Sequence, residues 1–133
     1  MTLVDTNVVI DILSGGLTWA SRSKRALADR ESRGAIYINE IVYAELSAGF
    51  STTDKLDVEI SRMRLNFAPL SKTALFAAGQ AFSRYRAAGG PRPNVLADFF
   101  LGAQANVQRW PLLTRDKRRY QVYFPDVALI DVA

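Results

Sequence analysis

The chain has 133 residues, of which 49% are hydrophobic and 23% charged, as in an ordinary globular domain. It contains no cysteine and no histidine, which excludes disulfides, thiolate or imidazole catalysis, and zinc sites built from those ligands. Any catalytic metal must therefore be bound by oxygen ligands, which favour Mg²⁺, Mn²⁺ or Ca²⁺. The net charge of +4 suits a polyanion such as nucleic acid, and equally suits simple solubility.

No apolar run reaches the roughly 18 residues that a membrane span needs, so no membrane association is expected. Asp5 and Asp11 interrupt the N-terminal apolar stretch, and no basic segment precedes it, which argues against a signal peptide. The sequence shows no linker and no internal repeat. We therefore expect one domain over residues 1–133, located in the cytoplasm.

Short apolar runs alternate with amphipathic segments along the whole chain. In chain order, the pattern predicts a strand at 2–4, a helix at 7–13, a helix at 18–33, a strand at 35–38, a helix capped by Asn39, a helix at 53–65, a strand at 67–70, a long helix capped by Ser71, a helix at 95–108 capped by Asn94, a strand at 111–114, a helical turn at 116–120 and a strand at 128–130. This order predicts an α/β sandwich with a mainly parallel central sheet of about five strands.

Four acidic residues lie in apolar surroundings. Asp5 follows the first strand, Glu45 interrupts an apolar helical stripe, Asp98 lies within Leu-Ala-Asp-Phe, and Asp116 follows the fourth strand. A carboxylate buried without a partner costs several kcal/mol or becomes protonated. Because ligands of such sheets bind beyond the carboxyl ends of the strands, a shared divalent cation at that edge explains all four.

Each carboxylate also has a simpler interpretation. Asp5 could cap the helix that follows it, and Glu45 could form a core salt bridge with an arginine. Asp98 could be an ordinary first-turn carboxylate, and Asp116 could belong to a solvated cluster of charges.

Taken together, the motifs are more specific than any one of them. A hydrophobic strand leads into Asp5-Thr-Asn7, a glutamate interrupts an amphipathic helix, Leu-Ala-Asp98-Phe follows, and Leu-Leu-Thr-Arg-Asp116 lies near the end. This series resembles the PIN-domain ribonucleases, and most closely the VapC-type toxins of toxin–antitoxin pairs. The resemblance spans nearly the whole chain. One departure is Gln104, at a position where relatives often have histidine.

The resemblance implies a PIN-like α/β/α sandwich and a metal-dependent endoribonuclease that uses Mg²⁺, with Mn²⁺ as a substitute. Carried over by position, the catalytic and metal-binding residues would be Asp5, Glu45, Asp98 and Asp116, supported by Asn7 and Thr114. Water rather than the ribose 2′-hydroxyl would attack, which would leave 5′-phosphate and 3′-hydroxyl ends.

Basic residues near these motifs are expected to contact RNA phosphates, where arginine offers paired donors. They are Arg86, Arg92, Arg115, Lys117 and Arg118. A solvated turn is the alternative for residues 115–119. The resemblance also implies a small VapB-type antitoxin that blocks the site, a homodimer, and a toxin–antitoxin hetero-oligomer.

Two other functions compete with the nuclease. An aspartate-based phosphotransfer domain would place a nucleophilic Asp after the first strand, but Asn7 stands where such enzymes have a second Asp. A catalytically inactive PIN-like module would bind RNA or protein, although none of the four acids is missing.

Overall fold

The central element is a five-stranded sheet with the strand order β3-β2-β1-β4-β5. The computed structural model describes residues 1–91 and 96–132 of the chain. All the strand pairs of this sheet are parallel. The strands are β1 (Thr2–Val4), β2 (Ile36–Ile38), β3 (Leu65–Phe67), β4 (Leu112–Thr114) and β5 (Leu129–Asp131). The predicted α/β class and parallel sheet are therefore confirmed.

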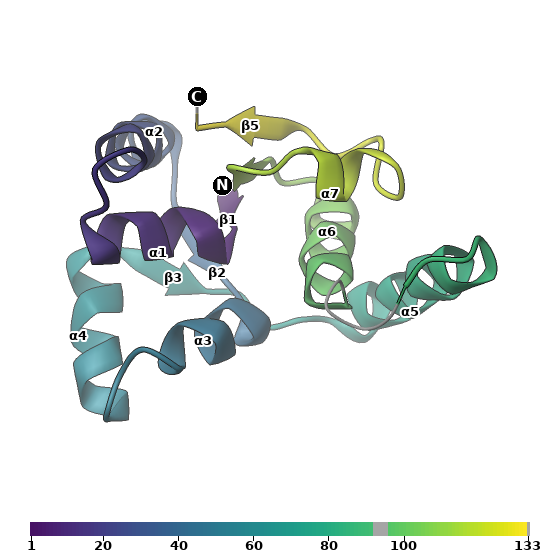
Figure 1. Ribbon diagram of the computed structural model, residues 1–133, viewed down its shortest axis with the longest axis horizontal. Coiled ribbons are helices and arrows are strands. Elements are labelled where there is room, and N and C mark those ends of the chain that lie inside the picture. The colour runs from purple at the N-terminus through teal and green to yellow at the C-terminus, as the bar shows by residue number, and fades with distance from the viewer. Residues whose placement is uncertain (92–95, 133) are drawn as a thin grey trace.

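Helices flank the sheet on both sides. They are α1 (Thr6–Ser14), α2 (Ala20–Arg33), α3 (Glu40–Ser47), α4 (Thr53–Arg62), α5 (Lys72–Ala87), α6 (Leu96–Gln108) and α7 (Arg118–Gln121). In Figure 1, α1 to α4 occupy the left part of the molecule around β2 and β3, and α5 and α6 lie on its right. None of the described helices is long and apolar enough to cross a membrane.

The strands are short, and the two central strands β1 and β4 are buried throughout. Leu3, Val4, Ile38, Leu112 and Leu113 have no exposed surface. A parallel sheet covered on both faces needs apolar side chains at successive positions, because both faces contact helices. This explains why continuous apolar runs, rather than alternating ones, predicted β1, β2, β4 and β5 to within one residue.

Local signals also set several helix starts. The side chain of Asn39 accepts a hydrogen bond from the Val42 amide at 3.0 Å, and Ser71 accepts one from the Ala74 amide at 3.1 Å. Both predicted caps are confirmed. The predicted cap Asn94 lies outside the described residues.

Some predicted boundaries were wrong. The third strand was expected at 67–70 but spans Leu65–Phe67, and the turn expected from Asp116 begins as a helix only at Arg118. Arg64 adopts a positive φ of 56°, which ends α4 early and sends the chain straight into β3. Leu65 then pairs with Ile36 and is buried. The sequence around Arg64 contains no glycine or proline to indicate this turn.

Gln104 links three parts of the fold. It is fully buried, and its Nε2 donates to the carbonyl oxygen of Ala68 at 2.8 Å. Its Oε1 accepts from the Asn39 side chain at 2.9 Å. Since Asn39 also caps α3, this one amide joins α6 to the start of α3 and to the segment after β3.

Gly102 allows α6 to pack closely against the segment after α7. A Cβ added at Gly102 would lie 2.4 Å from Cδ2 of Phe124, whose ring is buried and contacts Phe99. Such a close approach is possible only because Gly102 has no side chain.

We expect Gly102→Ala to lower the free energy of unfolding by about 1–3 kcal/mol, because the Phe124 ring must move within a packed core. Gly79→Ala is the matched control, because a Cβ at this exposed position of α5 meets nothing within 4 Å. It should raise stability by about 0.5–1 kcal/mol. Urea unfolding measures both, and equal stability of the Gly102→Ala variant and the wild type would contradict the packing argument.

Candidate active site

The candidate site lies where β1 and β4 run side by side in the middle of the sheet. After β1 the chain continues to β2 on one side of this pair, and after β4 it continues to β5 on the other side. Clefts form beyond the carboxyl ends of strands at such switch points. The Asp5 amide donates to the Leu113 carbonyl at 2.9 Å, which sets Asp5 beside Thr114.

Asp5 is nearly buried, with 4% of its surface exposed. Its Oδ2 accepts hydrogen bonds from the Tyr120 hydroxyl at 2.7 Å and the Thr114 hydroxyl at 2.8 Å, and a longer one from the Asn7 amide at 3.5 Å. Asp5 occupies the N-cap position of α1, but its side chain makes no capping bond, so capping does not account for its carboxylate.

The second oxygen of Asp5 is left for another partner. Within the described part of the chain, Oδ1 accepts no side-chain hydrogen bond, and no buried side-chain nitrogen or oxygen atom lacks a partner. Oδ1 must therefore be accessible rather than enclosed. This oxygen is suited to bind a ligand that enters the site.

Tyr120 is a site residue that the sequence did not indicate. It is fully buried, and its hydroxyl is bonded to Asp5. Burial raises the pKa of Tyr120 well above its usual value, and the charges of Asp5 and Asp98 raise it further. Tyr120 therefore stays a hydrogen-bond donor at any physiological pH. In the sequence, Tyr120 appears only as one aromatic residue after several basic ones, a pattern that does not indicate a contact with Asp5.

Thr114 connects Asp5 to Asp116. Its hydroxyl donates to Asp5 and accepts from the Asp116 amide at 3.0 Å. The supporting position predicted for Thr114 thus has a structural basis. The Asp116 carboxylate is about half exposed and forms an ion pair with Nε of Arg119 at 3.1 Å.

Glu45 lies differently from the sequence interpretation. It is exposed rather than directed into the core, and α3 buries Val42 and Leu46 instead. Its Oε1 accepts a hydrogen bond from the Thr6 hydroxyl at 2.7 Å, so it lies at the start of α1 beside Asp5. The alternative of a core salt bridge to an arginine is also wrong.

Asp98 shows that the four acids act on one another. It lies in the first turn of α6, and its side chain is 15% exposed. Burial raises the pKa of Asp98 to about 6, and the charges of Asp5, Glu45 and Asp116 add to the rise while Arg119 opposes it. The sequence-predicted acids therefore share one region, and a plain first-turn carboxylate does not describe Asp98.

The donor chemistry of these acids fits a hard divalent cation, since every ligand atom would be an oxygen. The present side-chain arrangement fits it less well. Among residues 1–91 and 96–132, no group of three or more acidic side chains is arranged to hold a metal ion. The cation that lies among them is the guanidinium of Arg119.

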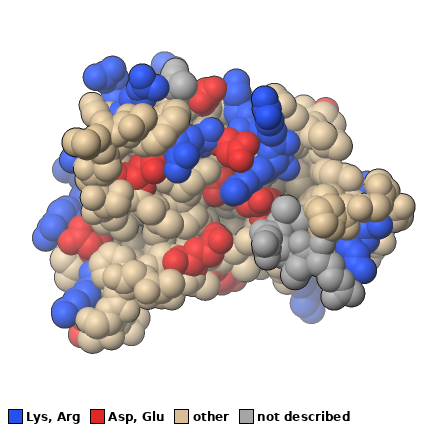
Figure 2. Space-filling model, in the orientation of Figure 1, with Lys and Arg blue, Asp and Glu red and all other residues tan. Residues whose placement is uncertain are grey.

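The surface around the site has a distinct charge pattern. Figure 2 shows acidic side chains in the hollowed middle of this face, with Lys and Arg side chains along its upper edge. A negative hollow beside a positive rim can attract a polyanion while its centre attracts a cation.

The basic residues expected to contact phosphates have different surroundings. Arg86 and Arg118 are exposed, and Lys117 forms an ion pair with Asp131 at 3.2 Å. Arg92 lies outside the described residues. Phosphate binding by these four side chains stays a prediction.

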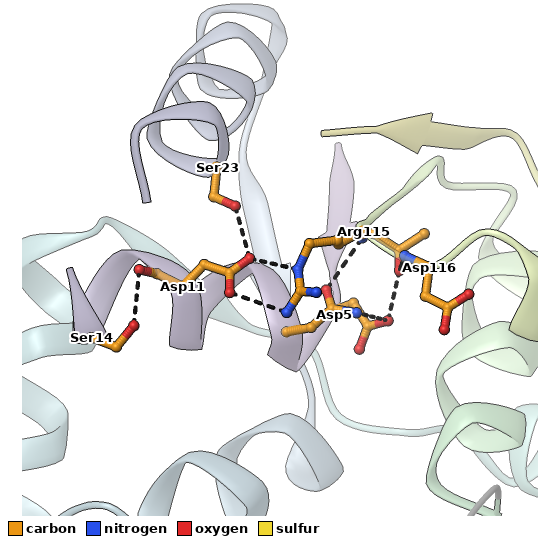
Figure 3. Close-up of polar contacts among 8 residues, drawn as sticks. Asp5, Asp11, Ser14, Ser23, Arg115 and Asp116 are labelled. Atoms are coloured by element: carbon orange, nitrogen blue, oxygen red, sulfur yellow. Dashed lines mark hydrogen bonds and ion pairs between the residues drawn. The ribbon is translucent and has the colours of Figure 1, made fainter. Parts of the chain in front are cut away.

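Arg115 is engaged in the fold. Its Nε and Nη2 donate to Asp11 at 2.8 and 3.2 Å, and its guanidinium lies 5.0 Å from the centre of the Trp19 ring. Asp11 also accepts a hydrogen bond from Ser23 of α2 (Figure 3). The Arg115 amide donates to Asn7 at 3.3 Å. Arg115 thus ties the loop that carries Asp116 to α1, and a phosphate would have to compete with Asp11 for it.

A sequence profile of the PIN domain matches residues 2–125. The chain belongs to the PIN domain family. Members of this family are generally nucleases and typically use divalent metals. A search of curated protein sequences found no match to this chain.

Solved structures share the same PIN fold at low sequence identity. The DNA-bound VapBC complex from Salmonella typhimurium matches with a TM-score of 0.75 and 18% identity, over 99% of this chain and 98% of the other. VapBC2 from Rickettsia felis, bound to a DNA fragment from its promoter, gives 0.74 and 18% over 98% and 97%. FitAcB from Neisseria gonorrhoeae gives 0.69 and 23% over 99% and 98%.

The raised pKa of Asp98 predicts a stability that depends on pH in the metal-free protein. Between the unfolded value of 3.8 and the folded value of about 6, the folded protein binds more protons, so stability falls as pH rises through this window. In EDTA at pH 7.5, Asp98→Asn should be more stable than wild type by on the order of 2 kcal/mol. This difference in the free energy of unfolding should vanish near pH 4. If the wild type is more stable than Asp98→Asn at pH 7.5, this prediction is wrong.

Arg115→Lys should lower the free energy of unfolding by about 1–2 kcal/mol, because lysine cannot form the paired contact with Asp11 or stack on Trp19. Arg118→Lys is the matched control and should stay within about 0.5 kcal/mol of wild type. Chemical denaturation measures both. Equal effects of the two substitutions would show that the Asp11 pair adds nothing to stability.

Proposed function

We propose that this PIN domain is a metal-dependent endoribonuclease of the VapC toxin type. One observation carries the proposal. The four acids lie at one edge of the sheet. The Thr114 hydroxyl bonds both Asp5 and the Asp116 amide, the Thr6 hydroxyl bonds Glu45 at the start of α1, and Arg119 bridges Asp98 and Asp116. The raised pKa of Asp98, which comes from burial and from the charges of the other three acids, agrees with this arrangement. Four acids gathered at a sheet switch point cost stability, which is typical of functional sites.

Asp5, Glu45 and Asp98 would hold Mg²⁺, or Mn²⁺ in its place, and Asp116 would complete the site or hold a second ion. When bound, the ion would lower the pKa of a water molecule and neutralise charge on the phosphoryl oxygens. The side chains of the protein prepare this site. Tyr120 and Thr114 hold Oδ2 of Asp5, so that Oδ1 is presented to the ligand.

The other protein groups have positioning and attracting roles. Thr6 holds the exposed Glu45 beside the site, and the Asp11 pair with Arg115 holds the loop before Asp116. Arg118 and the other rim cations would attract RNA phosphates, a contact that depends on salt. Water would attack the phosphorus and the 3′-oxygen would leave with a proton, so the product ends would carry a 5′-phosphate and a 3′-hydroxyl.

We also propose a small VapB-type antitoxin as the physiological partner. The support is the shared fold with chains of the Rickettsia and Salmonella VapBC complexes along almost their whole length. On this proposal the protein is a single domain over residues 1–133 that works in the cytoplasm, and forms a homodimer and a hetero-oligomer with its antitoxin.

Purified, antitoxin-free protein should cut total cellular RNA into discrete fragments in Mg²⁺ and leave it intact in EDTA. Asp98→Asn and Asp5→Asn should each lower the rate by about 100-fold or more, because each removes a charge from the reacting centre. Asp126→Asn changes an exposed acid outside the predicted set and should keep full activity. Gel analysis and sequencing of the RNA ends provide the measurement.

Other outcomes would favour the competing functions. If the wild type binds RNA but leaves it intact in both Mg²⁺ and Mn²⁺, the inactive binding module replaces the nuclease. If Asp5 becomes phosphorylated by a small phosphodonor while RNA stays intact, the phosphotransfer domain replaces it.

A further inference from the structure

Arg119 lies between two of the proposed metal ligands. Its Nη1 is 3.5 Å from Oδ1 of Asp98, and its Nε is 3.1 Å from Oδ2 of Asp116. One guanidinium thus bridges an acid on α6 and an acid in the loop before α7. About half of the Arg119 side chain is exposed, so it could leave this position without disturbing the core.

The charge of Arg119 lies in the field of three acids. Burial lowers the pKa of Arg119, but the charges of Asp98, Asp116 and Asp5 outweigh it and raise the pKa overall. In return, Arg119 lowers the pKa of Asp98. The guanidinium therefore neutralises part of the repulsion that a divalent cation would otherwise neutralise.

Neighbouring cations have other partners or stay in solvent. Arg115 is paired with Asp11, Lys117 with Asp131, and Arg118 is exposed. Among the described residues, Arg119 is the cation that forms ion pairs with the proposed metal ligands. No three acids of residues 1–91 and 96–132 are arranged to hold a metal, and the guanidinium of Arg119 lies between two of the proposed ligands.

We propose that Arg119 is the built-in counter-ion of the metal-free site, and that a divalent cation displaces its guanidinium when it binds between Asp98 and Asp116. This inference rests on the proposed metal dependence. Two ion pairs must break for each binding event, so Arg119 lowers the affinity for metal and stabilises the empty site. The released guanidinium then lies at the rim, where the substrate phosphate arrives.

Titration calorimetry with Mn²⁺ on the antitoxin-free full chain tests this directly. Arg119→Gln should bind Mn²⁺ about tenfold more tightly than wild type, which corresponds to about 1.4 kcal/mol. Arg118→Gln removes the same charge from the adjacent residue and should change affinity by less than about threefold, through the general field alone. If both variants change the affinity equally, the displacement model is overturned.

A second measurement uses the wild-type protein, in case Arg119→Gln does not fold. Nitrogen-15 NMR resolves the Nε–H signals of arginine side chains, and Arg119→Lys assigns the signal of interest. Saturating Mg²⁺ should move the Arg119 signal to the position of a solvated arginine, whereas the Arg115 signal should stay because its partner is Asp11. An Arg119 signal that stays in place at saturation would overturn the proposal.

RNA cleavage by the same three proteins separates the two proposals. If wild type cleaves RNA in Mg²⁺ but Arg119→Gln binds Mn²⁺ no more tightly than Arg118→Gln, the Arg119 inference fails and the nuclease stands. If Arg119→Gln binds more tightly while no protein cleaves RNA, the inference holds and the nuclease fails. If no protein binds Mn²⁺, both proposals fail.

Discussion

The gathering of negative charge at the carboxyl edge of the sheet is the constraint on which the rest of the site depends. The effect of this charge is seen at Asp98, whose pKa is raised to about 6 by burial and by three nearby acids. The hydroxyl groups of Tyr120 and Thr114 donate hydrogen bonds to the Asp5 carboxylate, and the hydroxyl of Thr6 donates one to the Glu45 carboxylate. These bonds stabilise part of the gathered negative charge. Proteins tolerate such local instability where binding or catalysis requires it.

The arginines around this edge contribute more to the fold than the composition suggests. Arg115 is held by Asp11 and Trp19, and Arg119 is held by Asp98 and Asp116. A surplus of positive charge in a sequence therefore does not translate directly into a surface free for RNA. The acids nearest in space, rather than the net charge, decide which cations are available.

Features with local causes were predictable from the sequence, and features with distant causes were not. Strands β1, β2, β4 and β5 followed from apolar runs, and two helix starts followed from Asn39 and Ser71. The bond from Tyr120 to Asp5 spans 115 positions and the pair of Arg115 with Asp11 spans 104, so no local pattern indicates either. Glu45 was misplaced because an eight-residue helix is too short for its stripe to define which side faces the core.

The side-chain amide of Gln104 links α3 to α6 through hydrogen bonds that do not depend on pH, which an imidazole could not provide. It donates to the Ala68 carbonyl and accepts from Asn39, and it keeps both bonds at any pH between 5 and 8 because an amide does not titrate there. Histidine at this position would change its charge near pH 6.5. Mild acidification therefore does not alter the link that positions the helices carrying Glu45 and Asp98. Any response of the site to pH must originate in the carboxylates themselves.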